Sequence, residues 1–376
     1  MRRIRTVGSA FVLALCTAQV SCFWIAPVSQ TSSETLMEAV RSYGGGKSAA
    51  PSAPMKESDF ESAAQAERTN EEEDEYKRHV KSLFNSWDFA GLDKEAREDR
   101  ATKSRLVGGE WKLYRFYDAV SEPTSGATGE MDWVNHLEAL RQWEAKEPNS
   151  VTPRIALAQA MVNYAWNARG VSTAYKVSDQ SWKLFGERLE LAARTLLEAA
   201  KMQEKCPHWF SVMQIVALGE GWDRNQAREL LERAASFEPD YDRYYRNYAY
   251  YMLPKWYGEE GDSESVANEF AKSLGGEHGQ FVYFQIARDI ICTCEADKPP
   301  MPKDLSWPKL QAGFDANERL YGVSNIELND YALMAYSAND KATAQQIFSR
   351  IGDDWSQPTW WNEEIFKDAK AWAAGT

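Results

Sequence analysis

Aromatic side chains gather in one short stretch of the sequence, FEPDYDRYYRNYAYYML at residues 237–253, which carries six tyrosines from Tyr241 to Tyr251. On a helix that turns by about 100° per residue, five of the six fall within an arc of about 120°, whereas Tyr250 points to the opposite side. Rings at helical spacing usually supply core area, so we expect these five to pack. The alternative is a binding surface, because a tyrosine carries a hydroxyl that packing alone does not require.

Five residues are our candidates for contact with a ligand. Arg243, Arg246 and Tyr250 point away from the main tyrosine stripe, and we expect them to line a groove. Trp166 and Arg169, in the segment YAWNARG, are expected to form a polar and aromatic pocket. The alternative for this pair is an arginine that stacks on a tryptophan and holds the loop that follows.

Known catalytic and metal-binding patterns are missing from the sequence. None of the four histidines, His79, His136, His208 and His278, has another histidine three or four residues away, and no H-E-x-x-H pattern occurs. We expect a structural role for His208, which follows a proline at a helix start. There is no G-x-S-x-G elbow, P-loop or dinucleotide fingerprint. We therefore assign no catalytic residue, no metal site and no cofactor.

The charge of the chain limits its partners. Lys and Arg number 43 against 56 Asp and Glu, which gives a net charge of −13. An acidic surface repels phosphate backbones, so we expect no nucleic-acid partner.

The first 22 residues, MRRIRTVGSAFVLALCTAQVSC, follow the pattern of a secretory signal peptide: three arginines, an apolar stretch from Val7 to Cys16, and then small and polar residues. The apolar stretch is too short to span a bilayer as a stable helix. Cys22 resembles the lipidated cysteine of a bacterial lipoprotein, although Gln19 stands where leucine is usual; ordinary cleavage in the same region is the alternative. We therefore predict an exported chain, either periplasmic or held to the membrane only through a lipid at Cys22.

Three further cysteines, Cys206, Cys292 and Cys294, lie in the body of the chain. We expect them to be packing residues, because cysteine is commonly buried. A disulfide between two of them is the alternative, although Cys292 and Cys294 would close a very tight loop.

The remainder divides into a predicted flexible linker, residues 23–74, and a helical domain, residues 75–376. The linker includes SYGGGKSAAPSAP and the charge run ERTNEEEDE. Helix-length periodic segments separated by Pro, Gly and Asp predict an all-α body without strands. The predicted helices are 75–85, 88–104, 110–120, 132–146, 153–168, 179–204, 208–219, 224–237, 240–256, 263–274, 279–294, 308–320, 325–337, 340–350 and 361–373.

Internal similarity predicts how these helices are arranged. TLLEAAKMQEKCPHWF is echoed by ELLERAASFEPDYDRY, so that Leu196 matches Leu230 at a spacing of 34 residues. Helix pairs that recur at about this spacing, with alanine where helices approach closely and proline at the turn, resemble tetratricopeptide repeats. Ala234 and Ala235 occupy the expected close-contact positions, Pro239 is expected to start the next helix, and Asp223 is expected to cap a helix together with Gln226. We therefore predict an α-solenoid of antiparallel helix pairs in a right-handed superhelix.

Several unusual motifs occur in one order: WDFAGLDKEAREDRATKSRLVGGEWKLYRFYD, SVTPRIALAQAMVNYAWNARG, SWKLFGERLELA, CPHWF and YYMLPKWYGEEGD. With these motifs, the chain closely resembles the bacterial domain-of-unknown-function family 4034 over residues 80–280. The resemblance implies a helical, repeat-like fold. It implies no activity, because the family has no established chemistry.

Architecture and compartment together favour a non-enzymatic protein that binds a protein or peptide in the bacterial cell envelope. The alternative is an envelope protein that binds or cleaves glycans in an acidic cleft lined by some of its 15 tryptophans and 17 tyrosines. A buried carboxylate with a perturbed pKa, flanked by aromatic rings in a cleft, would favour the enzyme. Neither hypothesis specifies an oligomeric state.

Overall fold

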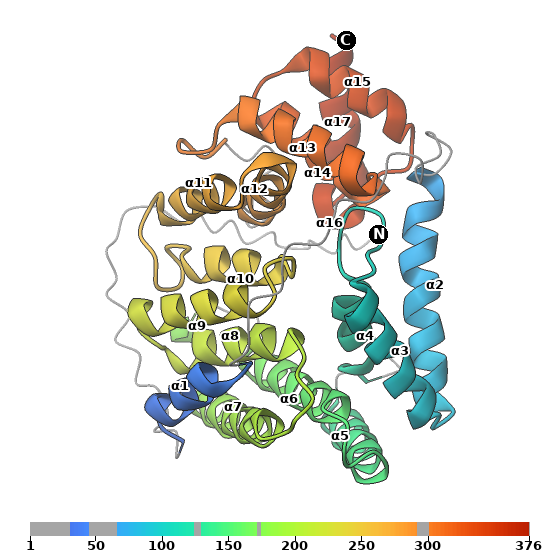
Figure 1. Ribbon diagram of the computed structural model, residues 1–376. Helices are drawn as coiled ribbons and strands as arrows, with labels where there is room; N and C mark the ends of the chain where they lie inside the picture. Colours follow the sequence, from blue (N-terminus) through green and yellow to red (C-terminus); the bar gives the residue numbers. More distant parts are fainter. Residues whose placement is uncertain (1–30, 45–65, 124–128, 171–173, 292–300, 376) are drawn as a thin grey trace, which may run out of the picture.

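The computed structural model describes residues 31–44, 66–123, 129–170, 174–291 and 301–375. These residues form 17 α-helices and a short 3₁₀ helix, Ala174–Lys176, and their only β-type pairing is an isolated bridge between Arg105 and Trp111. The all-α prediction is confirmed (Figure 1).

The first part of the chain forms α1 (Ser33–Ser42), α2 (Ala66–Asn85), α3 (Phe89–Thr102), α4 (Lys112–Val120) and α5 (Glu130–Lys146). The middle forms α6 (Thr152–Arg169), α7 (Asp179–Ala200), α8 (His208–Glu220), α9 (Arg224–Phe237), α10 (Arg243–Tyr251) and α11 (Asp262–Leu274). The last part forms α12 (Gly276–Ile291), α13 (Trp307–Tyr321), α14 (Asn325–Ser337), α15 (Lys341–Ile351), α16 (Gln357–Trp360) and α17 (Glu363–Ala374).

From α6 to α15 the helices pack in consecutive pairs: α6 with α7, α8 with α9, α10 with α11, α12 with α13, and α14 with α15. The first helix of each pair also contacts the first helix of the next pair. The pairs follow one another up the molecule in Figure 1. Helices α2, α3 and α4 lie together at the side of these pairs, where α4 contacts α6 and α2 contacts α14.

The predicted cap of α9 is confirmed. The side chain of Asp223 accepts hydrogen bonds from the backbone N–H groups of Asn225 and Gln226, and the Gln226 side chain accepts one from the Asp223 N–H. This reciprocal arrangement satisfies donors that the first turn of a helix leaves without partners. Ser324 and Glu327 form the same arrangement at the start of α14.

The residues matched at a spacing of 34 occupy equivalent buried positions. Leu196 on α7 and Leu230 on α9 are both fully buried, as is Ala234, one of the two alanines expected at a close helix contact. Ala235 is half-buried. Small side chains at such positions let neighbouring helices approach closely, and interiors of this kind are close-packed.

The prediction that Pro239 starts α10 is wrong. The helix begins four residues later, at Arg243. The intervening backbone is used for contacts with a distant loop. The carbonyl oxygen of Asp240 accepts a hydrogen bond from Arg105 at 2.6 Å and another from the indole N–H of Trp111 at 2.8 Å. A carbonyl held by these two donors is not free to accept the hydrogen bond of a helical turn.

The five tyrosines of the stripe are core residues, which confirms the packing interpretation. Each is at most 6% exposed: Tyr241, Tyr244, Tyr245, Tyr248 and Tyr251. Their hydroxyls also connect helix pairs. The hydroxyl of Tyr244 donates to the carbonyl of Pro207 at 2.9 Å, and that of Tyr251 donates to the carbonyl of Trp222 at 2.6 Å. Both acceptors flank α8, so these tyrosines supply core area and also satisfy carbonyls at its two ends.

The linker prediction is wrong for part of its range. Residues 33–42 form α1, and α2 begins at Ala66 rather than near residue 75. The side chains of Leu36, Met37 and Val40 are fully buried, and α1 packs against α7 and α9. The prediction failed because residues 33–42 are surrounded by low-complexity sequence. Their apolar side chains nevertheless recur at the spacing of an amphipathic helix, which suits burial of one face.

Of the cysteines, Cys206 is buried and forms no disulfide, as expected for a packing residue. Cys22, Cys292 and Cys294 lie outside the described residues, as does the predicted signal peptide. Within the described part of the chain, every helix is either too short or too polar to cross a bilayer.

Candidate functional site

Arg243 and Arg246 lie in an internal ion cluster instead of lining an open groove. Arg243 donates to the carboxylate of Glu110, and its guanidinium lies 3.7 Å from the centre of the Tyr114 ring. Arg246 forms two hydrogen bonds of 2.7 Å with Asp289 and one of 3.1 Å with Glu110. The two arginine side chains are 14% and 16% exposed. We call Glu110, Arg243, Arg246 and Asp289 the ion cluster.

The carboxyl groups of the ion cluster are held ionised. Burial by itself would raise the pKa of Glu110, but Arg243, Arg246 and Arg115 outweigh it, so the pKa lies below its usual range. The same balance, with Arg246 as the main cation, lowers the pKa of Asp289. Buried charges of this kind persist because each one has a hydrogen-bonded partner of opposite sign.

The loop between α3 and α4 brings Glu110 to these arginines. Gly108 and Gly109 have φ angles of 85° and 84°, a left-handed conformation that favours glycine. The N–H of Gly108 donates to the carbonyl of Tyr321 at 3.2 Å, and its own carbonyl accepts from Gln285 at 3.3 Å. The loop therefore packs against α12 and the end of α13 and occupies the side of α10 on which a ligand was expected.

Trp166, Arg169 and Tyr250 come together at another place, where α6, α7 and the end of α10 meet. The Arg169 guanidinium lies 5.8 Å from the ring centre of Trp166, 5.7 Å from that of Trp182 and 6.0 Å from that of Trp256. Trp166 and Trp256 meet edge to face at 5.6 Å, and Tyr250 lies 6.0 Å from Trp256. We call these five residues the aromatic cluster.

The aromatic cluster combines partial exposure with positive charge. All five of its side chains are half-buried. The exposed Lys255 places its ammonium 4.8 Å from the centre of the Tyr250 ring. Burial lowers the pKa of Arg169, but its guanidinium stays charged at neutral pH, as arginine does in proteins. The indole N–H groups of Trp166 and Trp256 have no hydrogen-bond partner among the described residues.

Local structure positions these rings. Trp166 and Arg169 lie in the last turn of α6, which ends at Gly170 with φ of 70°. Trp182 lies in the first turn of α7, where the hydroxyl of Ser178 accepts a hydrogen bond from the backbone N–H of Ser181. The turn after α10 brings Trp256 back toward Tyr250, since the Trp256 N–H donates to the carbonyl of Leu253 at 2.8 Å.

Both sequence interpretations of Trp166 and Arg169 have a counterpart in this geometry. The arginine does stack on the tryptophan, as the structural alternative required, and it does so within a larger group of half-exposed rings. Sequence reasoning missed Trp182 and Trp256 as members, because only the fold brings α7 and the turn after α10 to the end of α6. One signal could have pointed to them, because Trp182 lies in the motif SWKLFGERLELA and Trp256 in the motif YYMLPKWYGEEGD.

His208 has the structural role expected of it. Its Nδ1 lies 2.7 Å from the hydroxyl of Tyr241 and its Nε2 lies 3.1 Å from Oε1 of Gln159. The ring stacks on Tyr117 at 4.2 Å. Burial, reinforced by the charge of Arg243, lowers the pKa of His208 to about 3. The imidazole is therefore neutral at physiological pH, with Nε2 donating to Gln159 and Nδ1 accepting from Tyr241.

Among the described residues, three carboxyl groups have raised pKa values, and all three lie on α3 or α14. Burial raises the pKa of Asp93 to about 6, and it also raises the pKa values of Asp99 and Glu327. Each has structural partners: Asp93 accepts from the indole of Trp143 at 3.2 Å, and Glu327 pairs with Arg288 at 2.9 Å. In the described part of the chain, no group of three or more His, Cys, Asp or Glu side chains has the arrangement of a metal site.

No family model matches the chain, and no curated protein or solved structure matches it either. The resemblance to family 4034 therefore stays a prediction.

Proposed function

We propose that this chain is an exported helical-repeat protein that binds a peptide segment of a protein partner in the cell envelope, and that the aromatic cluster is the binding site. The contact is non-enzymatic in this proposal. The observation that carries it is the meeting of three tryptophans, a tyrosine and an arginine, all half-buried, where α6, α7 and α10 converge.

The residue types of the aromatic cluster support a role in protein recognition. Trp, Tyr and Arg dominate the binding energy of protein interfaces, because they offer large areas together with hydrogen-bonding groups. Lys255 and Arg169 add positive charge, so carboxylates of a partner would be attracted locally in spite of the acidic chain.

The arrangement of the helices supports a repeat architecture. Five consecutive helix pairs from α6 to α15 pack one on the next. In this proposal they form the tetratricopeptide-like superhelix, with the first helices of the pairs on its concave side. The loop between α3 and α4 and the ion cluster then fill one part of that side, and the aromatic cluster marks the part that is left for a ligand.

Glycan binding is the second candidate, because half-exposed tryptophan rings also suit stacking on sugars. Glycan cleavage has less support than glycan binding. The charged groups stacked on the aromatic cluster are cations, whereas cleavage needs carboxyl groups at the sugar. The carboxyl groups with raised pKa, Asp93, Asp99 and Glu327, lie on α3 and α14, which do not form the cluster.

The cellular compartment in this proposal is inferred from the sequence alone. The signal-like N-terminus supports export, and Cys22 supplies the point at which a lipid would hold the chain to a membrane. Replacement of Cys22 by Ser in the full chain tests the anchor, because a lipid-held protein would move from the membrane fraction to the soluble envelope fraction.

The binding site is tested by photo-cross-linking of the full chain in its native cells. A photo-reactive amino acid replaces Lys255, which is exposed beside the aromatic cluster, and in a matched control it replaces Lys94 on α3, whose side chain is 74% exposed. We expect one protein to be cross-linked from position 255 and not from position 94. We also expect a Trp256→Ala substitution to abolish the adduct.

The expected loss of affinity for that partner in the Trp256→Ala variant can be estimated. Loss of a central tryptophan from an interface costs at least about 2 kcal/mol, so Trp256→Ala should weaken binding by about 30-fold or more. Equal cross-linking from both positions would refute the assignment. If position 255 cross-links no protein, and the purified chain binds isolated cell-wall glycan through Trp256, the glycan alternative replaces the proposal.

A further inference from the structure

Helix α1 lies against the rest of the protein in the manner of a bound peptide. It contacts α7 and α9, which lie more than 130 residues away along the chain, and it lies beside them in Figure 1. Its apolar face is buried. The buried residues recur at the spacing of one helix face: Leu36, Met37, Val40 and Tyr43. Grooves that bind amphipathic helices accept anchors at this spacing.

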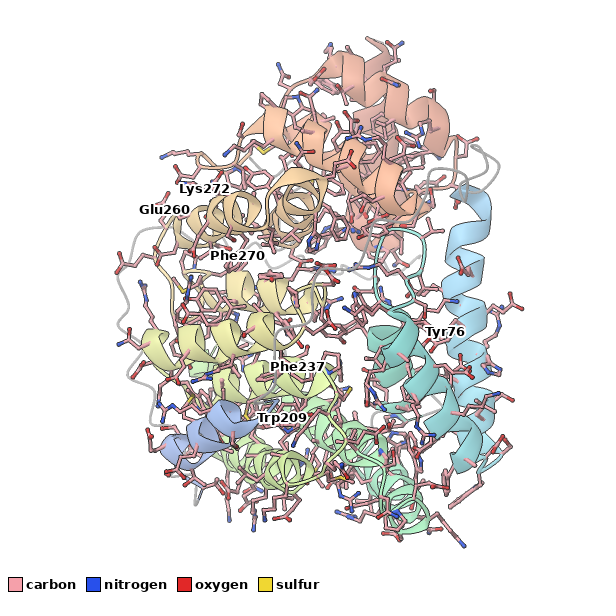
Figure 2. The ribbon with its side chains drawn as sticks, in the orientation of Figure 1. Tyr76, Trp209, Phe237, Glu260, Phe270 and Lys272 are labelled. Atoms are coloured by element: carbon pink, nitrogen blue, oxygen red, sulfur yellow. The ribbon has the colours of Figure 1, made fainter. Side chains whose placement is uncertain are left out.

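A defined pocket holds Tyr43, which follows the last residue of α1. The Tyr43 ring stacks on Trp209 at 4.1 Å, meets Phe210 edge to face at 5.1 Å and lies 5.9 Å from Phe237. Figure 2 labels Trp209 and Phe237 beside the ribbon of α1. The Tyr43 hydroxyl accepts from the backbone N–H of Cys206 at 2.9 Å and donates to its carbonyl at 3.2 Å. The pocket therefore recognises both the ring and the hydroxyl.

Polar contacts complement those apolar anchors. Arg41 forms hydrogen bonds of 2.7 and 3.0 Å with the carboxylate of Glu229 on α9. The hydroxyl of Thr31 donates to Glu190 on α7 at 2.6 Å, and the side chain of Gln226 donates to the Ser33 hydroxyl at 3.1 Å. The groove thus carries hydrogen-bonding groups that match the helix near both of its ends.

The sequence between α1 and the next helix is that of a tether. Residues 45–65, GGKSAAPSAPMKESDFESAAQ, are rich in Gly, Ser, Ala and Pro. This composition is typical of a linker, and a linker of this length would hold a ligand at an effective concentration of roughly millimolar, which would favour the internal ligand without making it permanent.

We propose that the groove between α7 and α9 is a docking site for an amphipathic helix with a tyrosine anchor, that α1 occupies it within the chain, and that a matching helix of a partner protein occupies it when α1 is displaced. The partner helix has apolar residues at the positions of Leu36, Met37 and Val40, a tyrosine seven residues after the first, and a basic residue to meet Glu229. This site is separate from the aromatic cluster and does not depend on its function.

The test uses the full chain with a protease recognition sequence inserted within residues 45–65. Cleavage leaves α1 bound without a covalent link, so it becomes exchangeable. A fluorescent peptide of residues 31–44 is then added, and its binding is followed by anisotropy, with circular dichroism to verify the fold.

We expect the labelled peptide to replace α1 in a saturable manner in the cleaved chain. A Tyr43→Ala peptide should bind about 30-fold more weakly or worse, because the pocket loses its anchor. A Glu38→Ala peptide is the matched control and should bind like the original, because Glu38 is exposed. A Trp256→Ala chain should bind the peptide unchanged, which separates this site from the aromatic cluster.

Three results would overturn the proposal. The first is an α1 that stays bound to the cleaved chain and never exchanges, which would make it a permanent part of the core. The second is loss of helical signal on cleavage. The third is an uncleaved chain that forms dimers by exchanging α1 as its concentration rises, since the occupant would then be a second copy of this chain rather than a partner protein.

Discussion

His208 should make the protein sensitive to mild acid. The folded protein keeps this histidine neutral, because burial lowers its pKa to about 3, whereas an unfolded chain binds the proton near pH 6.5. A histidine with a lowered folded pKa contributes stability that is complete above pH 6.5 and is lost as the pH falls toward the folded value. His208 should therefore weaken folding progressively between pH 6.5 and about 3.

The size of this loss of stability follows from the difference between the pKa of His208 in the unfolded and in the folded protein. Well below pH 6.5, each pH unit costs about 1.4 kcal/mol, because His208 is neutral in the folded state and charged in the unfolded one. Since the unfolded histidine is only half protonated at pH 6.5, the loss between pH 6.5 and 4.5 is about 2.3 kcal/mol. Among the charged groups near the imidazole, Arg243 opposes a second cation there, and the carboxylate of Glu110 offsets this effect and that of burial only in part. The neighbours are Tyr114, Tyr117, Gln159, Tyr241 and Arg243.

Urea unfolding followed by circular dichroism measures this loss. The variant His208→Gln keeps one donor and one acceptor but does not titrate, so its free energy of unfolding relative to that of the wild type should rise by about 2.3 kcal/mol as the pH falls from 6.5 to 4.5. His136, whose pKa burial lowers to about 4, contributes equally to both proteins and cancels in the difference. His79→Gln is the control, because that side chain is 53% exposed. Equal pH dependence in the wild type and His208→Gln would refute the reasoning.

The other predictions concern the free energy of unfolding at neutral pH. Glu110→Ala should cost about 3–5 kcal/mol, because it leaves two buried arginines without their shared carboxylate, whereas Lys367→Ala at an exposed ion pair should cost less than about 1 kcal/mol. Tyr251→Phe should cost about 1 kcal/mol through its buried hydrogen bond, and Tyr175→Phe, at an 82% exposed ring, should cost nothing measurable. Gly108→Ala should cost about 1–3 kcal/mol, because its φ is 85° and an added Cβ would lie 2.3 Å from a buried carboxylate oxygen on α14. Chemical denaturation measures the free energy of unfolding of each variant. If Lys367→Ala cost as much as Glu110→Ala, or Tyr175→Phe as much as Tyr251→Phe, the roles given to Glu110 and Tyr251 would be contradicted.

Local patterns predicted a large part of the helical structure. The arc of five tyrosines identified a buried helix face, and the Asp223 cap was visible from its spacing to Gln226. The pair Leu196 and Leu230 marked equivalent buried positions on α7 and α9. These predictions depend on interactions within a few residues or on a repeated pattern, both of which can be read along the chain.

The candidate site was predicted only in part. Trp166, Arg169 and Tyr250 were chosen for separate reasons, and the fold brings them into one cluster with Trp182 and Trp256. The other two candidates, both arginines on α10, were expected on an open groove and lie in the ion cluster instead. Helical spacing shows that they leave the tyrosine stripe, but it carries no information about what faces them.

By itself, the sequence determined the helical class of the protein, its acidic charge and the faces that its helices bury. Tertiary structure alone decided the partners of those faces. Arg243 meets Glu110 across 133 residues, and Tyr43 meets Cys206 across 163. An amphipathic pattern shows that a surface must leave water, but the hydrophobic effect has no direction, so the choice among many apolar surfaces depends on packing and hydrogen bonds formed only in the folded chain.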